Sequence, residues 1–187
     1  MYSVLINLCS ATNVNQWDQK AELDAAIYDK EYHFCSLFNR ILTLNAEEFN
    51  GREERKNRLL QELRGIYSVS ESNILIHIVG HGVVQNDEGV GIECIRYEEL
   101  HCALCNIGAV KSLIVNLLSP CMTNAISRFN NHNFIVLYNN CPERDINSPF
   151  EIDKLIVEND GITEEQFHRF CHQRNHTDDY YIRMQSE

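Results

Sequence analysis

The chain has 187 residues, of which 44% are hydrophobic and 23% are charged, and its formal net charge is -11. This length corresponds to one domain of about 100–200 residues, which buries enough surface to fold without disulfides or a metal. Three prolines and eight glycines exclude collagen-like and low-complexity material. No apolar run reaches the length of about 18 residues that a membrane span requires.

The acidic balance argues against nucleic acid as a partner, because phosphate-binding proteins cluster their lysines and arginines. The basic residues are scattered, apart from one partial cluster that alternates with glutamates: Arg52, Arg55, Lys56 and Arg58 with Glu53, Glu54 and Glu62. This spacing predicts the exposed face of a helix with i,i+4 ion pairs.

The redox state of the eight cysteines depends on the cellular compartment, and the start of the chain bears on that compartment. Residues 1–9 have no basic start, and their apolar run is too short for a secretory signal. We therefore expect a cytoplasmic protein whose cysteines stay reduced. Cys9 and Cys35 lie in apolar runs and are expected to be buried as small apolar side chains.

The first elements alternate between strand and helix. Residues 3–9 form an apolar run that predicts a buried strand. A loop rich in Asn and Thr follows at 10–15, and 17–29 carries part of a helical stripe. Residues 34–42 indicate a helix turn or an irregular connection. A helix is predicted over 47–66, on an apolar stripe of Leu59, Leu60, Leu63 and Ile66.

The middle of the chain continues this alternation. Residues 73–79 and 112–118 are apolar runs that predict two further buried strands. Between them, 83–97 contains the turn-forming run Asn-Asp-Glu-Gly, which predicts a small hairpin, and 97–106 predicts a short helix. Another helix is expected over 123–129.

The last predicted elements are a fourth strand at 133–138 and a helix at 163–172, which Thr163 would cap. Short apolar strands separated by helices indicate a parallel sheet covered on both faces. In such sheets, ligands bind beyond the carboxyl ends of the strands. The residues just after each strand are therefore the candidates for chemistry.

The first candidate is His81, which lies between Gly80 and Gly82 directly after the predicted strand 73–79. Glycines allow a tight turn and the close approach of a substrate. An imidazole, with an ordinary pKa of about 6.5, transfers protons at neutral pH.

The second candidate is Cys121, which follows the predicted strand 112–118 and precedes a predicted helix. A helix N-terminus favours a thiolate, the nucleophile of cysteine-dependent acyl transfer. Each candidate alone is more often a turn or a packing residue. Together, in the order His then Cys at two strand ends, they favour a catalytic function.

The cysteines at Cys102 and Cys105 form a C-x-x-C pattern beside His101. No second pair of this kind accompanies it, so we predict neither a metal site nor a cofactor. The simpler interpretation places both cysteines on one apolar helix face with Leu100 and Leu104.

At the two strand ends the sequence resembles the caspase-like cysteine peptidases, and most closely the CHAT group of separase-like and bacterial caspase-like proteins. Those domains carry one apolar strand ending in Gly-His-Gly and a later one ending in Leu-Ser-Ala-Cys-x-Thr-Gly. This chain has ILIHIVGHG at 74–82 and LSPCMTN at 118–124, with Pro120 and Asn124 in place of the usual Ala and Gly. The resemblance covers about residues 1–145 and implies a three-layer α/β/α sandwich around a mainly parallel sheet. We predict a single domain over 1–187, with a core of about 1–145 and a C-terminal extension, 146–187.

The resemblance implies a Cys-His dyad. Cys121 would attack the scissile carbonyl, and His81 would protonate the leaving amine. The backbone N–H groups of Gly82 and Cys121 would donate to the oxyanion.

The resemblance also implies a substrate pocket near the strand ends. Ser119 lies two positions before the nucleophile and would line this pocket, with Glu143 and Asp145 beyond the fourth strand. With a net charge of -11, we expect a preference for Arg or Lys before the cut. An acidic preference would need an arginine in the pocket, for which Arg144, between Glu143 and Asp145, is the nearby candidate.

The expected function is that of a cysteine endopeptidase acting on protein or peptide substrates. The resemblance suggests a regulated zymogen in a bacterial signalling or defence cascade, with an upstream activating protease or a regulatory partner. The alternative is a catalytically inactive caspase-like module for interaction or scaffolding. A small-molecule hydrolase or nucleotide-binding protein is less favoured, because no G-x-x-x-x-G-K or G-x-G-x-x-G phosphate loop is present.

Overall fold

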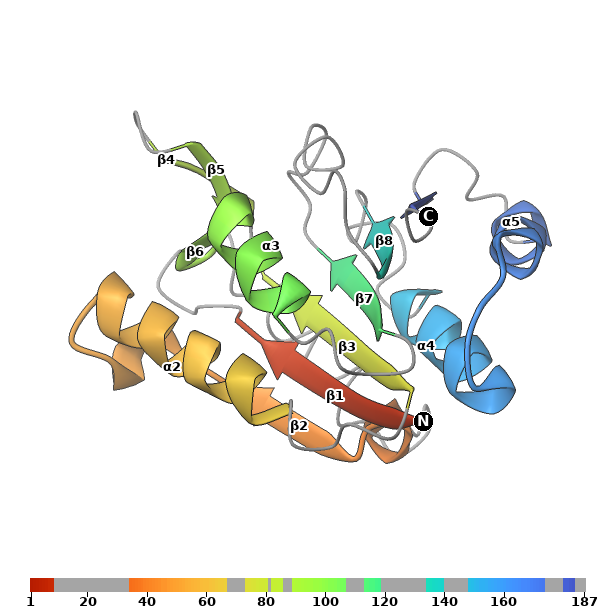
Figure 1. Cartoon of the computed structure of the whole chain (residues 1–187), viewed down its shortest axis with the longest axis horizontal. Coiled ribbons are helices and arrows are strands. Elements are labelled where there is room, and N and C mark those ends of the chain that lie inside the picture. The colour runs from red at the N-terminus through yellow and green to blue at the C-terminus, as the bar shows by residue number, and fades with distance from the viewer. Residues whose placement is uncertain are drawn as a thin grey trace.

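The computed structural model describes residues 1–8, 34–66, 73–80, 82–85, 89–106, 113–118, 134–139, 148–173 and 180–183. Its main sheet has six strands in the order β2-β1-β3-β7-β8-β9 (Figure 1). Their bounds are β1 Tyr2–Asn7, β2 Arg40–Thr43, β3 Ile74–Val79, β7 Leu113–Leu118, β8 Ile135–Asn139 and β9 Tyr180–Arg183. Neighbouring strands run parallel, except that β9 is antiparallel to β8. The predicted class, α/β with a mainly parallel sheet, is confirmed.

The central strands β1 and β3 are covered on both faces. Every residue of β3 is buried, as is every residue of β1 except the first. Long apolar runs without polar alternation are typical of parallel strands between two helix layers. The strands predicted over 3–9, 73–79, 112–118 and 133–138 are confirmed as β1, β3, β7 and β8, each end shifted by no more than two residues.

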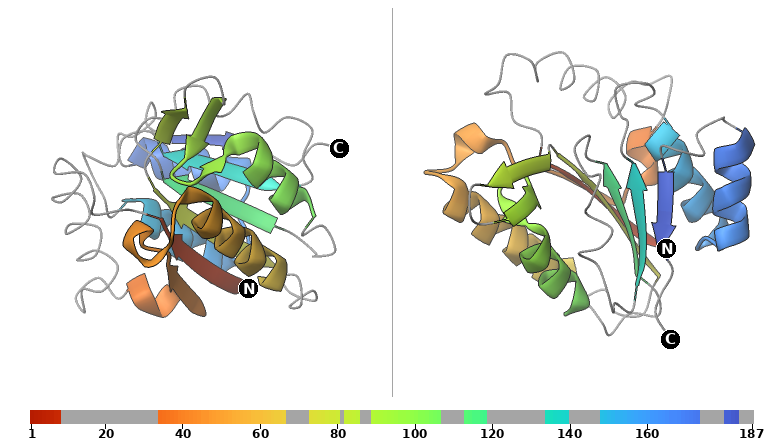
Figure 2. Two further views of the ribbon diagram at one scale, coloured as in Figure 1. Left: turned by 90° about the vertical axis from the view of Figure 1, so that its left-hand side faces the viewer. Right: turned by 90° about the horizontal axis from the view of Figure 1, so that it is seen from above.

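Helices lie on both faces of the sheet (Figure 2). On one face, α2 (Arg52–Ile66) and α3 (Tyr97–Cys105) pack Leu59, Leu63 and Leu100 against the strands. On the other face lie α4 (Ser148–Asn159) and α5 (Glu164–Gln173). The helices predicted over 97–106 and 163–172 are confirmed, and the Thr163 hydroxyl accepts from the Gln166 N–H at 3.2 Å.

A second, small sheet follows β3. It contains β4 (Gly82–Gln85), β5 (Gly89–Ile92) and β6 (Ile95–Arg96), all antiparallel. This sheet confirms the hairpin predicted over 83–97. It stands beyond the ends of the main strands, above the start of α3 (Figure 1).

The prediction for 34–42 was incomplete. A 3-10 helix, η2, covers Phe34–Leu37, but β2 then forms the edge of the main sheet. Asn39 fixes this edge, because its side-chain oxygen accepts from the Ser3 N–H at 2.8 Å and its own N–H donates to the Ser3 carbonyl at 2.9 Å. β2 is short and only half-buried, so it lacks the long apolar run that predicted β1, β3, β7 and β8, and the equally short β9 (Tyr180–Arg183) was not predicted either.

The helix predicted over 47–66 begins later than expected. A short 3-10 turn, η3 (Ala46–Glu48), comes first, and α2 starts only at Arg52. Gly51 separates the two with a φ of 118°, a conformation that favours glycine. The Asn50 N–H donates to the Glu54 carboxylate at 2.8 Å, which satisfies a donor at the helix entrance.

The prediction that the basic cluster of α2 is wholly exposed was wrong. The side chains of Arg55 and Glu62 are only 5% and 7% exposed. Arg58 does form the expected i,i+4 pair with Glu62, at 2.5 Å. Both residues belong to the buried stripe of the helix. Arg55 lies one turn before Leu59, and Glu62 directly precedes Leu63.

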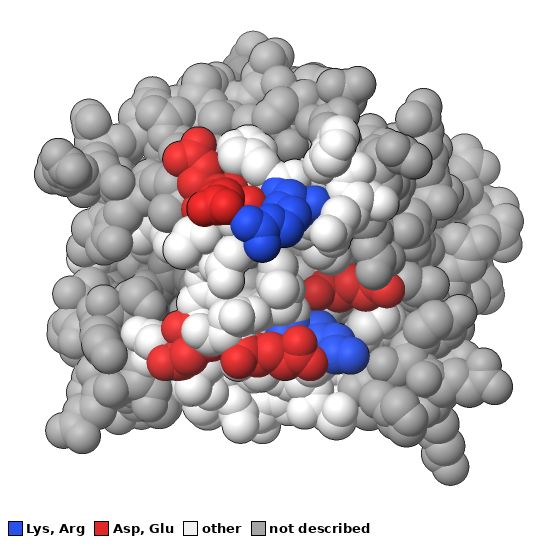
Figure 3. Space-filling view, turned by 90° about the vertical axis from the view of Figure 1, so that its right-hand side faces the viewer, with Lys and Arg blue, Asp and Glu red and all other residues white. Residues whose placement is uncertain are grey.

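The C-terminal extension contributes a helix layer to the core. Helix α4 was not predicted, yet Phe150, Ile152 and Ile156 are fully buried in it. Its outer surface and that of α5 carry interspersed charges of both signs (Figure 3), including the pairs Lys154–Glu158 at 3.9 Å and Arg169–Glu165 at 2.7 Å.

Several predictions fall outside the described residues. These are the loop at 10–15, the helices at 17–29 and 123–129, and the burial of Cys9; the side chain of Cys35, within η2, is not described either. Among the helices that the structure describes, each is too short or too polar to cross a lipid bilayer.

Candidate functional site at the carboxyl edge of the sheet

Four parallel strands end side by side. The register places Asn7 of β1 opposite Val79 of β3, Val79 opposite Leu118 of β7, and Leu118 opposite Asn139 of β8. The arrowheads of β1, β3 and β7 point to the same edge in Figure 1. We call this row of strand ends the carboxyl edge. In parallel sheets such an edge is where ligands bind.

The candidate dyad residues follow two neighbouring members of this row. His81 comes two positions after Val79, and Cys121 comes three positions after Leu118. Neighbouring strands lie about 4.8 Å apart, and an extended chain spans about 3.3–3.6 Å per residue. The pairing of β3 with β7 places Val79 and Leu118, the strand ends from which His81 and Cys121 follow, opposite each other.

The structure describes only part of the predicted site. Gly82 opens β4 opposite Ile92. His81, Ser119, Cys121, Glu143 and Asp145 lie outside the described residues. What the structure brings together is the strand ends from which these residues continue.

Gly80, the residue before His81, is tightly enclosed. A Cβ at this position would lie 2.8 Å from Cγ of Glu93 and 3.1 Å from side-chain atoms of both Ile92 and Leu8. Any side chain would force a neighbour to move, so the glycine is required by close packing. The turn between β5 and β6 thus rests directly on the backbone that leads into His81.

A polar cluster that sequence reasoning missed lies beside Gly80. Arg55 donates from Nε to the Leu44 carbonyl at 2.8 Å, from Nη2 to the Leu8 carbonyl, and from Nη1 to the Glu93 carboxylate at 3.3 Å. The signal was present, because Arg55 occupies a position of the apolar stripe of α2. A cavity of about 260 Å³ adjoins the cluster and is lined by Ala46, Gly51, Arg52, Arg55, Glu93 and Cys94.

Burial disfavours the thiolate form of three described cysteines. It raises the pKa of Cys94, which is 2% exposed, and that of Cys105. It raises the pKa of Cys171 to about 11. These three thiols therefore lack the thiolate character that a nucleophile needs.

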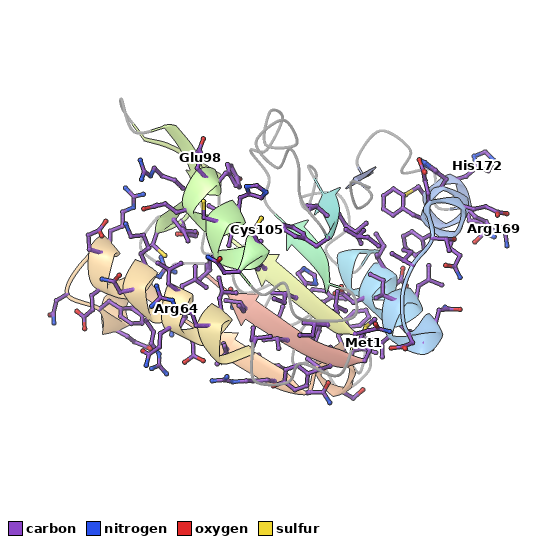
Figure 4. The ribbon with its side chains drawn as sticks, viewed as in Figure 1. Met1, Arg64, Glu98, Cys105, Arg169 and His172 are labelled. Atoms are coloured by element: carbon purple, nitrogen blue, oxygen red, sulfur yellow. The ribbon has the colours of Figure 1, made fainter. Side chains whose placement is uncertain are left out.

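The expectation that Cys102 and Cys105 share one apolar helix face with Leu100 and Leu104 was wrong. Leu100 and Leu104 are buried, but Cys102 is exposed and Cys105 is half-buried at the carboxyl end of α3 (Figure 4). The Cys105 thiol lies 3.4 Å from Nε2 of His101, and burial lowers the pKa of that imidazole. Within the described ranges, no three His, Cys, Asp or Glu side chains gather to hold a metal ion.

Another histidine, His77, lies in a central strand of the sheet. His77 of β3 is fully buried, and its Nδ1 pairs with the carboxylate of Asp153 on α4, which is also fully buried. Its ring stacks on Phe150 with centroids 4.9 Å apart. This imidazole has no access to a substrate, so it is not an alternative to His81.

The comparisons with known proteins add no relative. A scan against models of protein families finds no match to this chain, and a search of the curated proteins finds no similar sequence.

Proposed function

We propose that the chain is a caspase-like cysteine endopeptidase with a dyad of His81 and Cys121, built on a three-layer α/β/α sandwich. The observation that supports this most is the pairing of β3 with β7, in register up to Val79 and Leu118. The two motifs that resemble the CHAT group follow these two strand ends. Helices on both faces of a mainly parallel sheet are compatible with the proposed sandwich.

The proposed reaction is acyl transfer to the thiol of Cys121. The thiolate attacks the scissile carbonyl and forms a C–S bond, and His81 protonates the amine as the C–N bond breaks. Water then hydrolyses the thioester. The N–H groups of Gly82 and Cys121 stabilise the oxyanion, and one such donor commonly contributes about 3 kcal/mol.

The proposed substrates are proteins or peptides with a basic residue before the cut. Ser119 is small and neutral, and Glu143 and Asp145 supply negative charge beyond β8. In a panel of peptide amides that differ only before the cut, we expect Arg and Lys to be cleaved faster than Asp. Faster cleavage of Asp would contradict this specificity without contradicting the dyad.

The proposed setting is a regulated zymogen in a bacterial signalling or defence cascade, activated by an upstream protease or a regulatory partner. The support for this setting is the family resemblance alone.

The dyad is tested by the chemistry of individual thiols. In the folded protein, iodoacetamide should alkylate Cys121 faster than Cys94 and Cys171, which are 2% and 3% exposed. An electrophilic peptide ending in Arg should label Cys121 covalently. Cys121→Ala should abolish labelling and cleavage, whereas Cys102→Ala, which removes an exposed thiol on α3, should leave both intact.

Other outcomes would favour the alternative. If Cys121 reacts no faster than the buried thiols and no peptide electrophile labels it, even after limited proteolysis, the dyad is not functional. The fold would then serve as an inactive module for interaction or scaffolding.

A further inference from the structure

Arg55 is a buried cation that joins four parts of the fold. It lies on α2 with its side chain 5% exposed. It donates to the carbonyl of Leu8 just after β1, to the carbonyl of Leu44 just after β2, and to the Glu93 carboxylate between β5 and β6. Leu8 and Leu44 both follow the carboxyl ends of their strands. Arg55 therefore holds together the part of the carboxyl edge that adjoins β3.

Glu93 carries this connection to β3. Its side chain is 10% exposed, and its φ of 50° lies in the left-handed region that a non-glycine residue seldom adopts. The conformation costs on the order of 1 kcal/mol and persists only where the surroundings hold it. Cγ of Glu93 packs on Gly80, where a Cβ would come within 2.8 Å.

A second ion pair of α2 has one buried partner, Glu62, but its arginine is 40% exposed and it lies at the other end of the strands. Glu62, 7% exposed, pairs with Arg40 at 2.6 Å. Arg40 is the first residue of β2, so that pair lies at the amino end of the parallel strands. Stability alone does not explain the Arg55–Glu93 pair, because an apolar replacement is often no less stable than a buried ion pair.

From this geometry we infer that Arg55 and Glu93 are positioning residues for the proposed catalytic histidine. The inference rests on the proposed function. Arg55 fixes the side chain of Glu93, which fixes the backbone of Gly80, and Gly80 sets where the chain enters His81. Neither residue is assigned contact with the substrate.

The test compares variants of the two ion pairs. Glu93→Ala removes the packing on Gly80 and the partner of Arg55. Glu93→Gln keeps the shape and an acceptor for Arg55, and it serves as the decisive variant if Glu93→Ala does not fold. Glu62→Gln is the control, because it alters an ion pair on the helix that carries Arg55 but at the amino end of the strands. Each is compared with wild type and His81→Ala by thermal unfolding, by the pH profile of Cys121 alkylation with iodoacetamide, and by kcat and KM on the best basic peptide of the panel.

We expect Glu93→Ala to lower kcat about 10- to 100-fold with little change in KM, since a misplacement of about 1 Å can cost about 100-fold. Its alkylation profile should move toward that of His81→Ala. Glu93→Gln, which keeps the shape of the side chain but removes the charge of the pair with Arg55, should lower kcat and move the profile in the same direction by a smaller factor, whereas Glu62→Gln should retain wild-type kcat and profile. A merely structural role would lower the unfolding temperature without moving the pH profile.

Two contrary results are distinguishable. If His81→Ala changes the alkylation profile but the Glu93 variants match Glu62→Gln, the positioning role is wrong and the dyad stands. If His81→Ala itself leaves the reactivity of Cys121 unchanged, the dyad is wrong and the positioning role falls with it.

Discussion

His77 shows how a polar residue is accommodated in the middle of a buried strand. Its Nδ1 pairs with Asp153, while Phe150 stacks on one face of the ring and Phe38 meets it edge-on at 6.2 Å. Both partners of the pair are fully buried. Such a pair depends on both members, because the survivor of a substitution is left in an apolar site without its partner.

Replacing Asp153 should therefore destabilise the protein strongly. We expect Asp153→Ala to lower the free energy of unfolding by about 3 kcal/mol, within the range for breaking a buried pair. Urea unfolding monitored by circular dichroism measures the change. On the same helix, Glu158→Ala removes a pair that is 59% exposed on the glutamate side and should cost less than about 0.5 kcal/mol. Equal effects of the two substitutions would contradict the role given to the buried pair.

The connection between α2 and α3 depends on one carboxylate. Glu99 lies in the first turn of α3 and accepts from the Arg96 N–H at 3.1 Å and from Lys56 of α2 at 3.0 Å. Burial alone would raise the pKa of Glu99, but hydrogen bonds from Arg96 and Lys56 outweigh this effect and lower it from 4.5 to about 2. Hydrogen bonds to Glu53 and to Glu99 raise the pKa of Lys56.

This shift predicts a pH dependence of stability. A carboxyl group whose pKa is lower in the folded state stabilises the protein above its unfolded pKa, and the contribution is lost as the pH falls through the folded pKa. For Glu99 the loss occurs between pH 4.5 and about 2. We expect Glu99→Gln to be less stable than wild type by roughly 1 kcal/mol at pH 7, with the difference shrinking through this window.

Chemical unfolding at a series of pH values tests the prediction. Glu98→Gln is the control, because Glu98 is the neighbouring exposed glutamate of the same first turn. A difference between Glu99→Gln and wild type that persists at pH 2, or one that Glu98→Gln reproduces, would contradict the assignment.

Elements with strong local signals could be predicted from the sequence. The buried strands are uninterrupted apolar runs. The start of α5 is indicated by Thr163 and Gln166: the Thr163 N–H donates to the Gln166 side-chain oxygen at 2.8 Å, and the Gln166 N–H donates to the Thr163 hydroxyl at 3.2 Å. Helix α4 was missed because polar residues surround its stripe, although Ser148 and Pro149 form a typical helix start. β2 has no local signal in the sequence, because four residues at a sheet edge are too few to show a hydrophobic periodicity.

The sheet order is a property of the whole molecule, yet the sequence predicted the part of it that adjoins the candidate site. Parallel strands with helical crossovers imply a common carboxyl edge, and β3 and β7 do end there together. The position of Arg55 on the apolar stripe of α2 indicates that its side chain is buried, but its partners could not be derived in the same way. Its contact with Glu93 joins residues 38 positions apart along the chain.

The C-terminal helices are part of the core and not an appendage to it. Phe150, Ile152 and Ile156 of α4 and Phe167 of α5 are each no more than 1% exposed. They cover one face of the sheet, where Leu75 and Leu137 lie. Burying each such side chain contributes about 1.5–3 kcal/mol, and the total is comparable with the whole stability of a domain, about 5–15 kcal/mol.

A fragment of residues 1–145 should therefore not fold cooperatively, although the family resemblance covers about this region. Without α4, one face of β3 and β8 would be exposed and His77 would lose Asp153. A fragment of residues 1–173 is the control, because it loses β9, an edge strand, and should still unfold in one transition, at a lower temperature. Near-ultraviolet circular dichroism, thermal unfolding and binding of a hydrophobic dye measure both fragments. A native-like spectrum and a sharp transition for residues 1–145 would show that the sheet does not need its C-terminal helix layer.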